Sequence, residues 1–334
     1  MSGIVEIAKK AGVSPATVSR ALRGMHHVNE RTRKKIVEAA QLLEYPIRPD
    51  LLPAGSVERT NMVGVVCPYI SRWYFSQAIN GIEQSLREAG MDLLLYNFSQ
   101  VDARKRVFLQ KQLRGKVDGL IVISMPPTDE EFESLLELGI PISLIGLEHQ
   151  GCSSISIDDV EGGRIAGQYL VDMGHREISY LGGQRDTSFN FSASDDRRAG
   201  LLEVLERNGI EFREEFEIRG DFDIRTAQLA TEGLLSRKKL PTAIFCASDE
   251  MAFGAMNAIR KKGLRVPEDI SIIGFDDHEI AQYIGLTTVA QQVQFQGQLA
   301  ASQIMAKIEK PERESASMKV PISLVVRDTV AKIN

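Results

Sequence analysis

The chain has 334 residues and a formal net charge of −5, and its content of 43% hydrophobic and 25% charged residues is typical of a globular protein with two or three domains. No apolar run approaches the roughly 20 residues that a membrane-spanning helix needs, and the first residues show no basic region followed by an apolar one. The three cysteines, Cys67, Cys152 and Cys246, are too few and too far apart for a disulfide framework, so we expect a protein of the reducing cytoplasm and not a membrane or secreted protein.

The charge is distributed unevenly along the chain. Residues 1–48 contain nine Lys or Arg and four Asp or Glu, a net charge of +5, whereas the remainder has a net charge of −10. A basic segment on an acidic protein indicates that only this segment contacts a polyanion. The alternative is the solvated basic face of an ordinary helix.

Three short helices are predicted in the first 45 residues. An apolar stripe that begins at Val5 ends at Gly12, a natural C-terminal stop. Ser14 is a candidate N-cap, and Pro15 suits the first position of a second helix that ends near Gly24. A third helix is expected from about residue 29 to residue 43.

Residues 7–22 have the pattern of a helix-turn-helix. Ala8 is small where two helices would touch, Gly12 permits a tight turn, and Val13 is an apolar anchor after that turn. On the outer face of the second helix, Arg20 can read guanine, while hydroxyl groups suit phosphates or base edges. A helical hairpin that binds nothing is the alternative. The candidate DNA contacts in this motif are Ser14, Pro15, Ala16, Thr17, Ser19 and Arg20.

The segment after this motif is predicted to be a linker. It contains Pro46, Pro49, Pro53 and Gly55 and shows no helical period. It is the clearest domain boundary in the chain.

From residue 62 onward, short apolar runs alternate with amphipathic stretches. Continuous apolar runs are typical of parallel strands that helices cover on both faces. Two such series predict an α/β fold with two doubly wound halves, and ligands of such folds bind beyond the carboxyl ends of the strands. The predicted strands are 62–67, 92–96, 119–123, 141–145, 178–181, 243–246 and 270–275, and the predicted helices are 75–89, 102–114, 129–138, 195–208, 224–236 and 249–262.

The residues from Ala8 to Leu22 match A-x-x-A-G-V-S-x-x-T-V-S-R-x-L, and the chain here resembles the lactose-repressor family of bacterial regulators. Other motifs of that family follow in order and at similar spacing, so the resemblance covers nearly the whole chain. They are VDGLI at 117–121, GIP at 139–141, GHREI at 174–178, PTAIF at 241–245, VPEDIS at 266–271, GFDD at 274–277 and LTTV at 286–289.

The resemblance implies a fold and a mechanism. An all-α DNA-binding head would occupy residues 1–46, a linker residues 47–61, and a core residues 62–334. The core would have two lobes joined by three crossing strands, as in periplasmic sugar-binding proteins, at about 62–157 with 290–320 and 158–289 with 321–334. A homodimer would bind double-stranded operator DNA, and a small effector between the lobes would control that binding. No cofactor and no metal are expected.

The linker departs from the family pattern. The family has Asn-x-x-Ala-x-x-Leu here, which folds on DNA as a hinge helix and inserts its leucine into the minor groove. This chain lacks that spacing, so we expect a short or displaced hinge and looser coupling between head and core. Leu51 and Leu52 are the candidate minor-groove contacts, and a displaced wedge formed by them is the alternative.

Several positions match ligand-binding residues of the family. Arg197 matches an arginine that binds ligand oxygens, Asp276 an aspartate that accepts from ligand hydroxyls, and Asp249 a polar position at the cleft mouth. A structural ion pair is the alternative for the first two, and core packing is the alternative for each aromatic residue of the loop 69–75. The full candidate set is Tyr69, Trp73, Tyr74, Phe75, Ser124, Arg197, Asp249 and Asp276.

The predicted cleft also differs from the family. Gly146-Leu147 replaces a common Asp-Arg pair after the fourth core strand, and Gln292 replaces a usual proline. The loss of two polar groups favours a neutral or weakly charged effector such as a sugar or nucleoside.

Other functions fit the sequence less well. The chain has no G-x-G-x-x-G or G-x-x-x-x-G-K-[ST] motif, and its five histidines share no metal-ligand spacing with the cysteines, so an enzyme is not expected. A secreted solute-binding protein conflicts with the basic head. A regulator that responds to a phosphorylated protein instead of a small molecule stays open.

Overall fold

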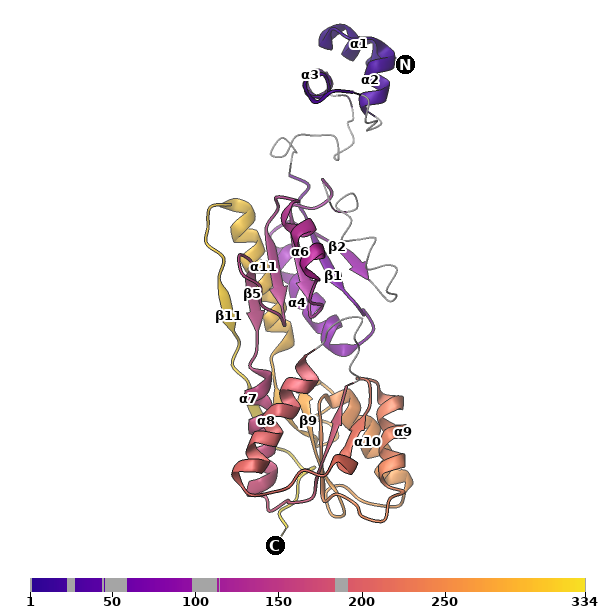
Figure 1. Ribbon diagram of the computed structural model, residues 1–334, viewed down its shortest axis with the longest axis vertical. Coiled ribbons are helices and arrows are strands. Elements are labelled where there is room, and N and C mark those ends of the chain that lie inside the picture. Colours follow the sequence, from indigo (N-terminus) through magenta and orange to yellow (C-terminus); the bar gives the residue numbers. More distant parts are fainter. Residues whose placement is uncertain are drawn as a thin grey trace.

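The computed structural model describes residues 2–22, 28–43, 45, 59–97, 113, 115–183 and 192–333 (Figure 1). The linker residues 46–58, with the candidate contacts Leu51 and Leu52, lie outside the described residues. So does most of the predicted helix 102–114.

The N-terminal head consists of the three predicted helices α1 (Ser2–Ala11), α2 (Pro15–Leu22) and α3 (Glu30–Gln41). Gly12 adopts a left-handed φ of 68°, which lets the chain reverse between α1 and α2. Asn29 caps α3, because its side chain accepts a hydrogen bond from the amide of Thr32. The head has a small core of its own, which contains Ile7, Ala8, Val18, Ala21, Val28, Ile36, Ala39 and Ala40.

The rest of the described chain forms two lobes, each built on a six-stranded sheet (Figure 1). The strand order is β11-β5-β4-β3-β1-β2 in the first sheet and β12-β10-β9-β8-β6-β7 in the second. All neighbouring strands are parallel except β10 and β12. The strands of the first sheet are β1 (Met62–Cys67), β2 (Asp92–Asn97), β3 (Gly119–Ile123), β4 (Ile142–Ile145), β5 (Ser153–Ser156) and β11 (Ser317–Lys319). Those of the second are β6 (Ile178–Gly182), β7 (Glu217–Arg219), β8 (Ala243–Cys246), β9 (Ser271–Asp276), β10 (Thr287–Ala290) and β12 (Ser323–Val325).

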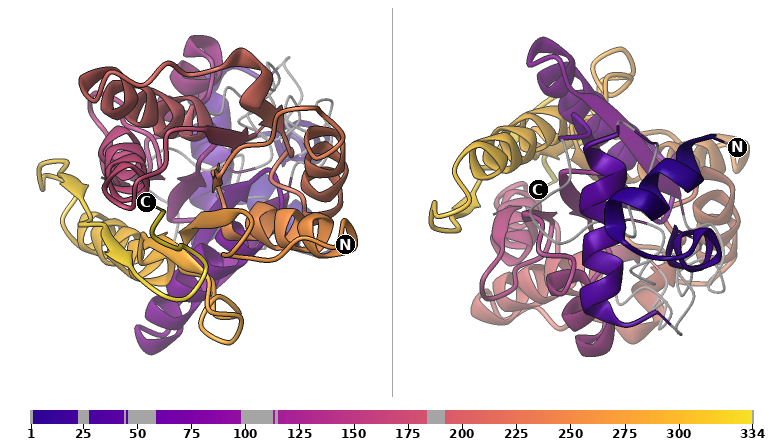
Figure 2. Two further views of the ribbon diagram at one scale, coloured as in Figure 1. Left: turned by 90° about the horizontal axis from the view of Figure 1, so that it is seen from below. Right: turned by 90° about the horizontal axis from the view of Figure 1, so that it is seen from above.

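Helices cover both faces of each sheet, as the continuous apolar strands predict. In the first lobe, α4 (Trp73–Glu88) and α11 (Val293–Glu309) pack on one apolar layer, and α6 (Asp129–Leu136) packs on the opposite one. In the second lobe, α7 (Asp159–Asp172) pairs with α8 (Ala193–Arg207), and α9 (Ile224–Leu234) pairs with α10 (Asp249–Lys261). The two pairs lie on opposite sides of the sheet (Figures 1 and 2). The predicted α/β class with two doubly wound halves is therefore confirmed.

The chain passes between the two sheets three times. The crossings follow β5, β10 and β11, at residues 157–158, 291–292 and 320–322. Each lobe is therefore assembled from separate stretches of the sequence. Among the helices that the structure describes, none is both long and apolar enough to span a membrane.

Close packing of α7 and α8 positions the cleft residues near the crossings. A Cβ atom on Gly163 of α7 would overlap the carbonyl oxygen of Arg197, and one on Gly200 of α8 would overlap that of Val160. Glycines at these positions let the two helix backbones touch. As a result, the side chain of Arg197 reaches the first turn of α7.

Candidate functional site

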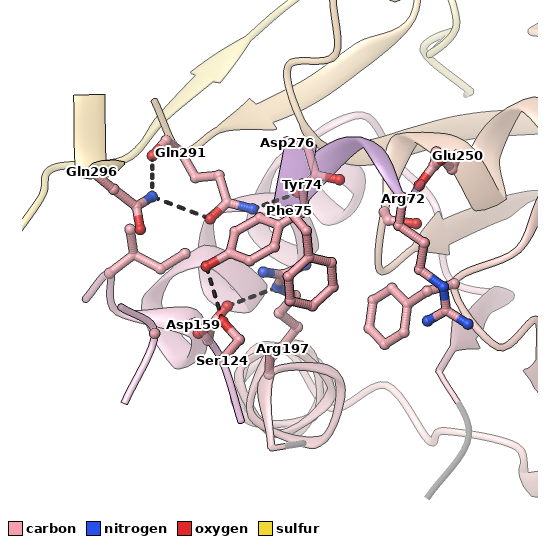
Figure 3. A pocket seen from close by; sticks show the side chains of 15 residues that line it. Arg72, Tyr74, Phe75, Ser124, Asp159, Arg197, Glu250, Asp276, Gln291 and Gln296 are labelled. Atoms are coloured by element: carbon pink, nitrogen blue, oxygen red, sulfur yellow. Dashed lines mark hydrogen bonds and ion pairs between the residues drawn. The ribbon is translucent and has the colours of Figure 1, made fainter. Parts of the chain in front are cut away.

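A cleft of about 750 Å³, a volume that includes its part open to solvent, lies between the two lobes (Figure 3). Ser124 follows β3, Gly146 follows β4, Ser248 follows β8, and Asp276 is the last residue of β9, so these residues meet at the carboxyl ends of their strands. This is where doubly wound sheets bind ligands, because backbone groups and side chains beyond the strand ends are free to turn outward.

Arg197 is the buried cation of the cleft. Its Nε donates to Asp159 Oδ1 at 2.8 Å and its Nη1 donates to the carbonyl of Ala247 at 2.6 Å. The guanidinium also lies 3.5 Å from the centre of the Phe275 ring. Burial raises the pKa of the Asp159 carboxyl, although the charge of Arg197 opposes that rise. These contacts orient the Arg197 side chain in the cleft, and the pairing with Asp159 largely balances its positive charge.

Asp276 faces Arg197 from the end of β9. Its backbone has a φ of 127°, a conformation that L-residues rarely adopt. Its carboxyl accepts from Gln291 Nε2 at 2.5 Å and from the backbone amide of Asp249 at the start of α10. Burial raises the pKa of Asp276 to about 7, against the charge of Arg197 and the hydrogen bond from Gln291, which lower it. At neutral pH, this carboxyl can therefore be charged and accept hydrogen bonds, or be protonated and donate one.

Tyr74 and Phe75 supply aromatic surface from the first turn of α4. The Tyr74 hydroxyl lies 3.0 Å from Ser124 Oγ (Figure 3). Burial raises the pKa of Tyr74 to about 12, so its hydroxyl keeps its proton. The side-chain amide of Gln291 donates to Asp276, and Gln296 Nε2 donates to the backbone carbonyl of Gln291 at 2.6 Å. The cleft therefore offers oriented donors and acceptors beside flat apolar rings.

The structure brings five of the eight candidate effector residues together in this cleft, and three lie elsewhere. Tyr69 packs edge-on against Phe75 with ring centres 5.9 Å apart. Asp249 is fully buried instead of standing at the cleft mouth. Its two oxygens accept from the amide of His278 at 2.8 Å and the hydroxyl of Thr288 at 2.7 Å, so it fixes the segment after Asp276. Trp73 lies at the boundary between the lobes. The five that line the cleft are Tyr74, Phe75, Ser124, Arg197 and Asp276.

Other cleft residues were not among the candidates. Asp159 is the second residue of an Asp-Asp pair at a helix start, a pattern that indicates only capping. Glu250 directly follows Asp249, which matches a family position, and this was the one available signal for it. Phe222 lies in a turn after β7 with a φ of 52°, and nothing in the sequence marks it. Arg72, Ser248, Gln291 and Gln296 complete this group of polar and aromatic lining residues.

The predicted DNA contacts lie on α2 or at its start. Ser14, Pro15, Ala16 and Arg20 are exposed, whereas Val18 and Ala21 are buried in the head. Ser14 Oγ accepts from the amide of Thr17 at 3.2 Å and lies 2.8 Å from its hydroxyl. Thr17 and Ser19 are half-buried. Within the described part of the chain, no group of three His, Cys, Asp or Glu residues is placed to hold a metal ion.

Comparison with known families matches both parts of the chain. Residues 3–46 match the family described as bacterial regulatory proteins, lacI family, and residues 167–330 match the periplasmic binding protein-like domain. The chain is 34% identical over 343 residues to the probable HTH-type transcriptional repressor ExuR of Bacillus subtilis (strain 168), covering 100% of this chain and 99% of ExuR.

Solved structures agree over the same length. The transcriptional regulator CelR in complex with cellobiose has a TM-score of 0.72 at 28% identity, covering 98% of this chain and 99% of CelR. The lac repressor dimer bound to operator and the anti-inducer ONPF has a TM-score of 0.71 at 30% identity, covering 97% and 98% of the two chains. These similarities place the chain among transcriptional repressors and not among enzymes. The chain belongs to the lacI family of bacterial regulatory proteins, as a transcriptional repressor with a helix-turn-helix head and a periplasmic-binding-protein-like core.

Proposed function

We propose that this repressor binds a neutral or weakly charged polyhydroxy compound, a sugar or nucleoside, between its lobes, and that this effector controls operator binding. One observation carries the proposal: Arg197 and Asp276 lie in one buried cleft that both lobes line. A ligand that contacts both lobes changes the equilibrium between their arrangements, and by linkage operator DNA and effector must affect each other's binding equally.

The charges of the cleft favour this class of effector. Arg197 is already paired with Asp159, so it offers hydrogen bonds without a large unbalanced charge. Asp276, with its pKa near 7, can accept from a hydroxyl or donate to a carbonyl. Tyr74, Phe75 and Phe222 provide rings on which a sugar face or a base can stack. The cellobiose complex of a related regulator is consistent with a carbohydrate.

On the DNA side, we propose that a cytoplasmic homodimer places two heads on an operator, as in the lac repressor dimer bound to operator. Ser14, Pro15, Ala16, Thr17, Ser19 and Arg20 would contact DNA from α2 or its start, and Leu51 and Leu52 from the linker. We keep residues 1–46 as the head, 47–61 as the linker and 62–334 as the core.

Exposed apolar side chains on the second lobe, among them Leu229, Ile280 and Tyr283, suit a subunit interface.

A thermal-shift screen of sugars, polyols, sugar phosphates and nucleosides tests the proposal. An effector at 100 times its dissociation constant should stabilise the protein by roughly 2.7 kcal/mol. A compound that stabilises the protein must then change its retention of operator DNA in a gel. The proposal would be contradicted if only a phosphorylated protein partner stabilised the repressor. It would also be contradicted if none of the compounds that stabilise the repressor changed its binding to operator DNA.

A further inference from the structure

Trp73, the first residue of α4 in the first lobe, is held by residues of the second lobe. Its indole ring stacks on the imidazole of His278, with ring centres 4.8 Å apart and planes inclined by 25°. The indole Nε1 donates to the carboxylate of Glu279. Both partners lie in the turn that follows β9. The side chain therefore bridges the lobes and does not line the cleft.

The backbone of the same residue makes a second contact across the boundary. Arg72, the N-cap of α4, makes no side-chain hydrogen bond to the helix end. Instead, the carboxyl of Glu250 accepts from the amide of Trp73. Glu250 belongs to the first turn of α10 in the second lobe, and Arg72 lies close enough to interact with its charge (Figure 3). The second lobe thus caps a helix of the first lobe.

The imidazole of His278 is fixed from several sides. Its Nδ1 accepts from the amide of Ile280 at 3.0 Å, and its ring lies edge-on to Phe253 with centres 5.1 Å apart. Burial lowers the pKa of His278, while the nearby Glu279 opposes this shift. The ring is therefore neutral at pH 7 and stacks on the indole as an aromatic group. Asp249 accepts from the backbone amide of His278 and holds this turn against α10.

We propose that Trp73, together with Glu250, His278 and Glu279, forms a clasp between the lobes that holds the cleft closed. The inference rests on the proposed function in one respect, namely that the cleft is where the effector enters. Any separation of α4 from the second lobe breaks the ring stack, the indole hydrogen bond and the helix cap together. Trp73, His278 and Glu279 lie outside the cleft lining, whereas Glu250 also lines the cleft, so the clasp controls access to the cleft from its boundary.

Trp73 is the only tryptophan of the chain, so its fluorescence reports on the clasp directly. We would measure quenching by acrylamide in the full-length protein, with neither effector nor DNA present. His278→Ala, Glu279→Ala and Glu250→Ala should each raise the quenching constant, about two-fold for His278→Ala. Glu83→Gln on the exposed side of α4, where Glu83 pairs with Arg87, is the matched control and should leave quenching unchanged.

Hydrogen exchange distinguishes an opened cleft from a locally uncovered ring. In the clasp variants, peptides that carry Ser124 and Gly146, which line the cleft, should exchange several-fold faster than in Glu83→Gln. Circular dichroism confirms that each variant is folded. Glu279→Ala changes an exposed residue, so this variant still provides the test if another variant unfolds. Unchanged quenching, or faster quenching with unchanged exchange at Ser124 and Gly146, would overturn the clasp. Neither outcome bears on the proposed function, because the experiment contains no effector and no operator.

Discussion

Gly163 and Arg197 are in backbone contact, with the carbonyl oxygen of Arg197 where a side chain at position 163 would begin. This contact brings α7 and α8 together and places the Arg197 guanidinium 2.8 Å from Asp159. The geometry of the cleft therefore depends on a residue that has no side chain.

Substituting Gly163 with alanine should separate α7 from α8, because backbone atoms cannot rotate away as a flexible side chain can. We expect a loss of about 1–3 kcal/mol in the free energy of unfolding, measured by urea denaturation. Gly233→Ala is the control, because a Cβ in that position of α9 meets nothing within 4 Å. It should be neutral or stabilise the protein by about 0.5–1 kcal/mol. Equal losses in both variants would show that helix contact is not the cause.

Asp276→Ala should abolish the response to effector while operator binding survives. Removing a charged hydrogen-bond acceptor costs about 2 kcal/mol, or roughly 30-fold in affinity. Isothermal titration calorimetry with the effector from the screen measures the affinity, and a gel shift without effector is the control for DNA binding. If Asp276→Ala bound the effector with unchanged affinity, Asp276 would not be part of the effector-binding site.

The affinity for such an effector should also depend on pH. The pKa of Asp276 is raised by burial to about 7, so the carboxyl gains a proton as the pH falls through 7. A ligand hydroxyl that donates to the carboxylate then loses its acceptor, and binding should weaken between pH 8 and pH 6. Asp276→Asn should bind the effector more weakly, and its affinity should no longer depend on pH in this range. If the variant keeps the pH dependence of the wild type, another titrating group is responsible for it.

Deleting residues 1–48 should abolish operator binding and leave a folded dimeric core. The head has its own apolar core and carries the excess of basic residues. In the intact protein, Arg20→Ala should cost about 1–3 kcal/mol at one operator position if the arginine reads a base. Operator variants in a binding assay locate that position. A truncated core that still shifts operator DNA would disprove the assignment.

Acid should destabilise the protein through His175. This buried residue donates from Nε2 to the carbonyl of Ala331 at 3.1 Å, and its Nδ1 lies 2.9 Å from the Thr242 hydroxyl. Burial lowers its pKa below the ordinary value of 6.5, so the unfolded chain binds the proton more readily. Its contribution to stability is complete above pH 6.5 and is lost as the pH falls towards the lowered value. Thermal melts between pH 7.5 and pH 5 should show a smaller decline in His175→Gln than in wild type, with His278 accounting for part of what remains. If the melting temperatures of wild type and His175→Gln fell equally with pH, His175 would not be the cause of the acid destabilisation.

In sedimentation experiments at micromolar concentration, the protein should be a dimer and not a tetramer. Tyr283 is 81% exposed and lies beside the exposed Ile280 and Ile284, so it is a good position at which to disturb the proposed interface. Tyr283→Asp should shift the equilibrium towards monomer, because a charge replaces apolar surface that the partner would bury. A wild-type tetramer, or a variant dimer of unchanged stability, would count against this interface.

Most of the apolar strands and amphipathic helices could be predicted because burial leaves a pattern in the sequence, although β10 and α11 were not among those predicted. β5 could not, because Ser153, Ser154 and Ser156 occupy a buried strand. Their polarity is satisfied by side-chain hydrogen bonds such as Ser154 to Ser317 at 2.8 Å and Ser156 to Glu148 at 3.0 Å. The glycine-rich helix α7 was missed for a related reason. Its glycines lower the helix propensity of the segment. They allow α8 to pack closely against α7, which only the folded structure reveals.

The cleft shows the same limit. Arg197 and Asp276 could be proposed because they match ligand-binding positions of the family, whereas the pairing of Arg197 with Asp159 arises from contact between two helices. Asp249 matches a family position as well, but it is buried and its side chain accepts from the backbone amide of His278. Trp73 and Tyr74 are neighbours on one helical turn, and the turn sends one side chain to the other lobe and the other into the cleft.

The three crossings between the sheets also have a consequence for synthesis of the protein on the ribosome. The head emerges first and has its own core, so it can fold early. The first lobe must wait for α11 and β11, and the second for β12 and the final residues, where the amide of Ala331 bonds to Ser271 Oγ and that of Ile333 to the carbonyl of Met173. A chain that terminates even slightly early therefore carries a complete DNA-binding head and an unfinished sensor.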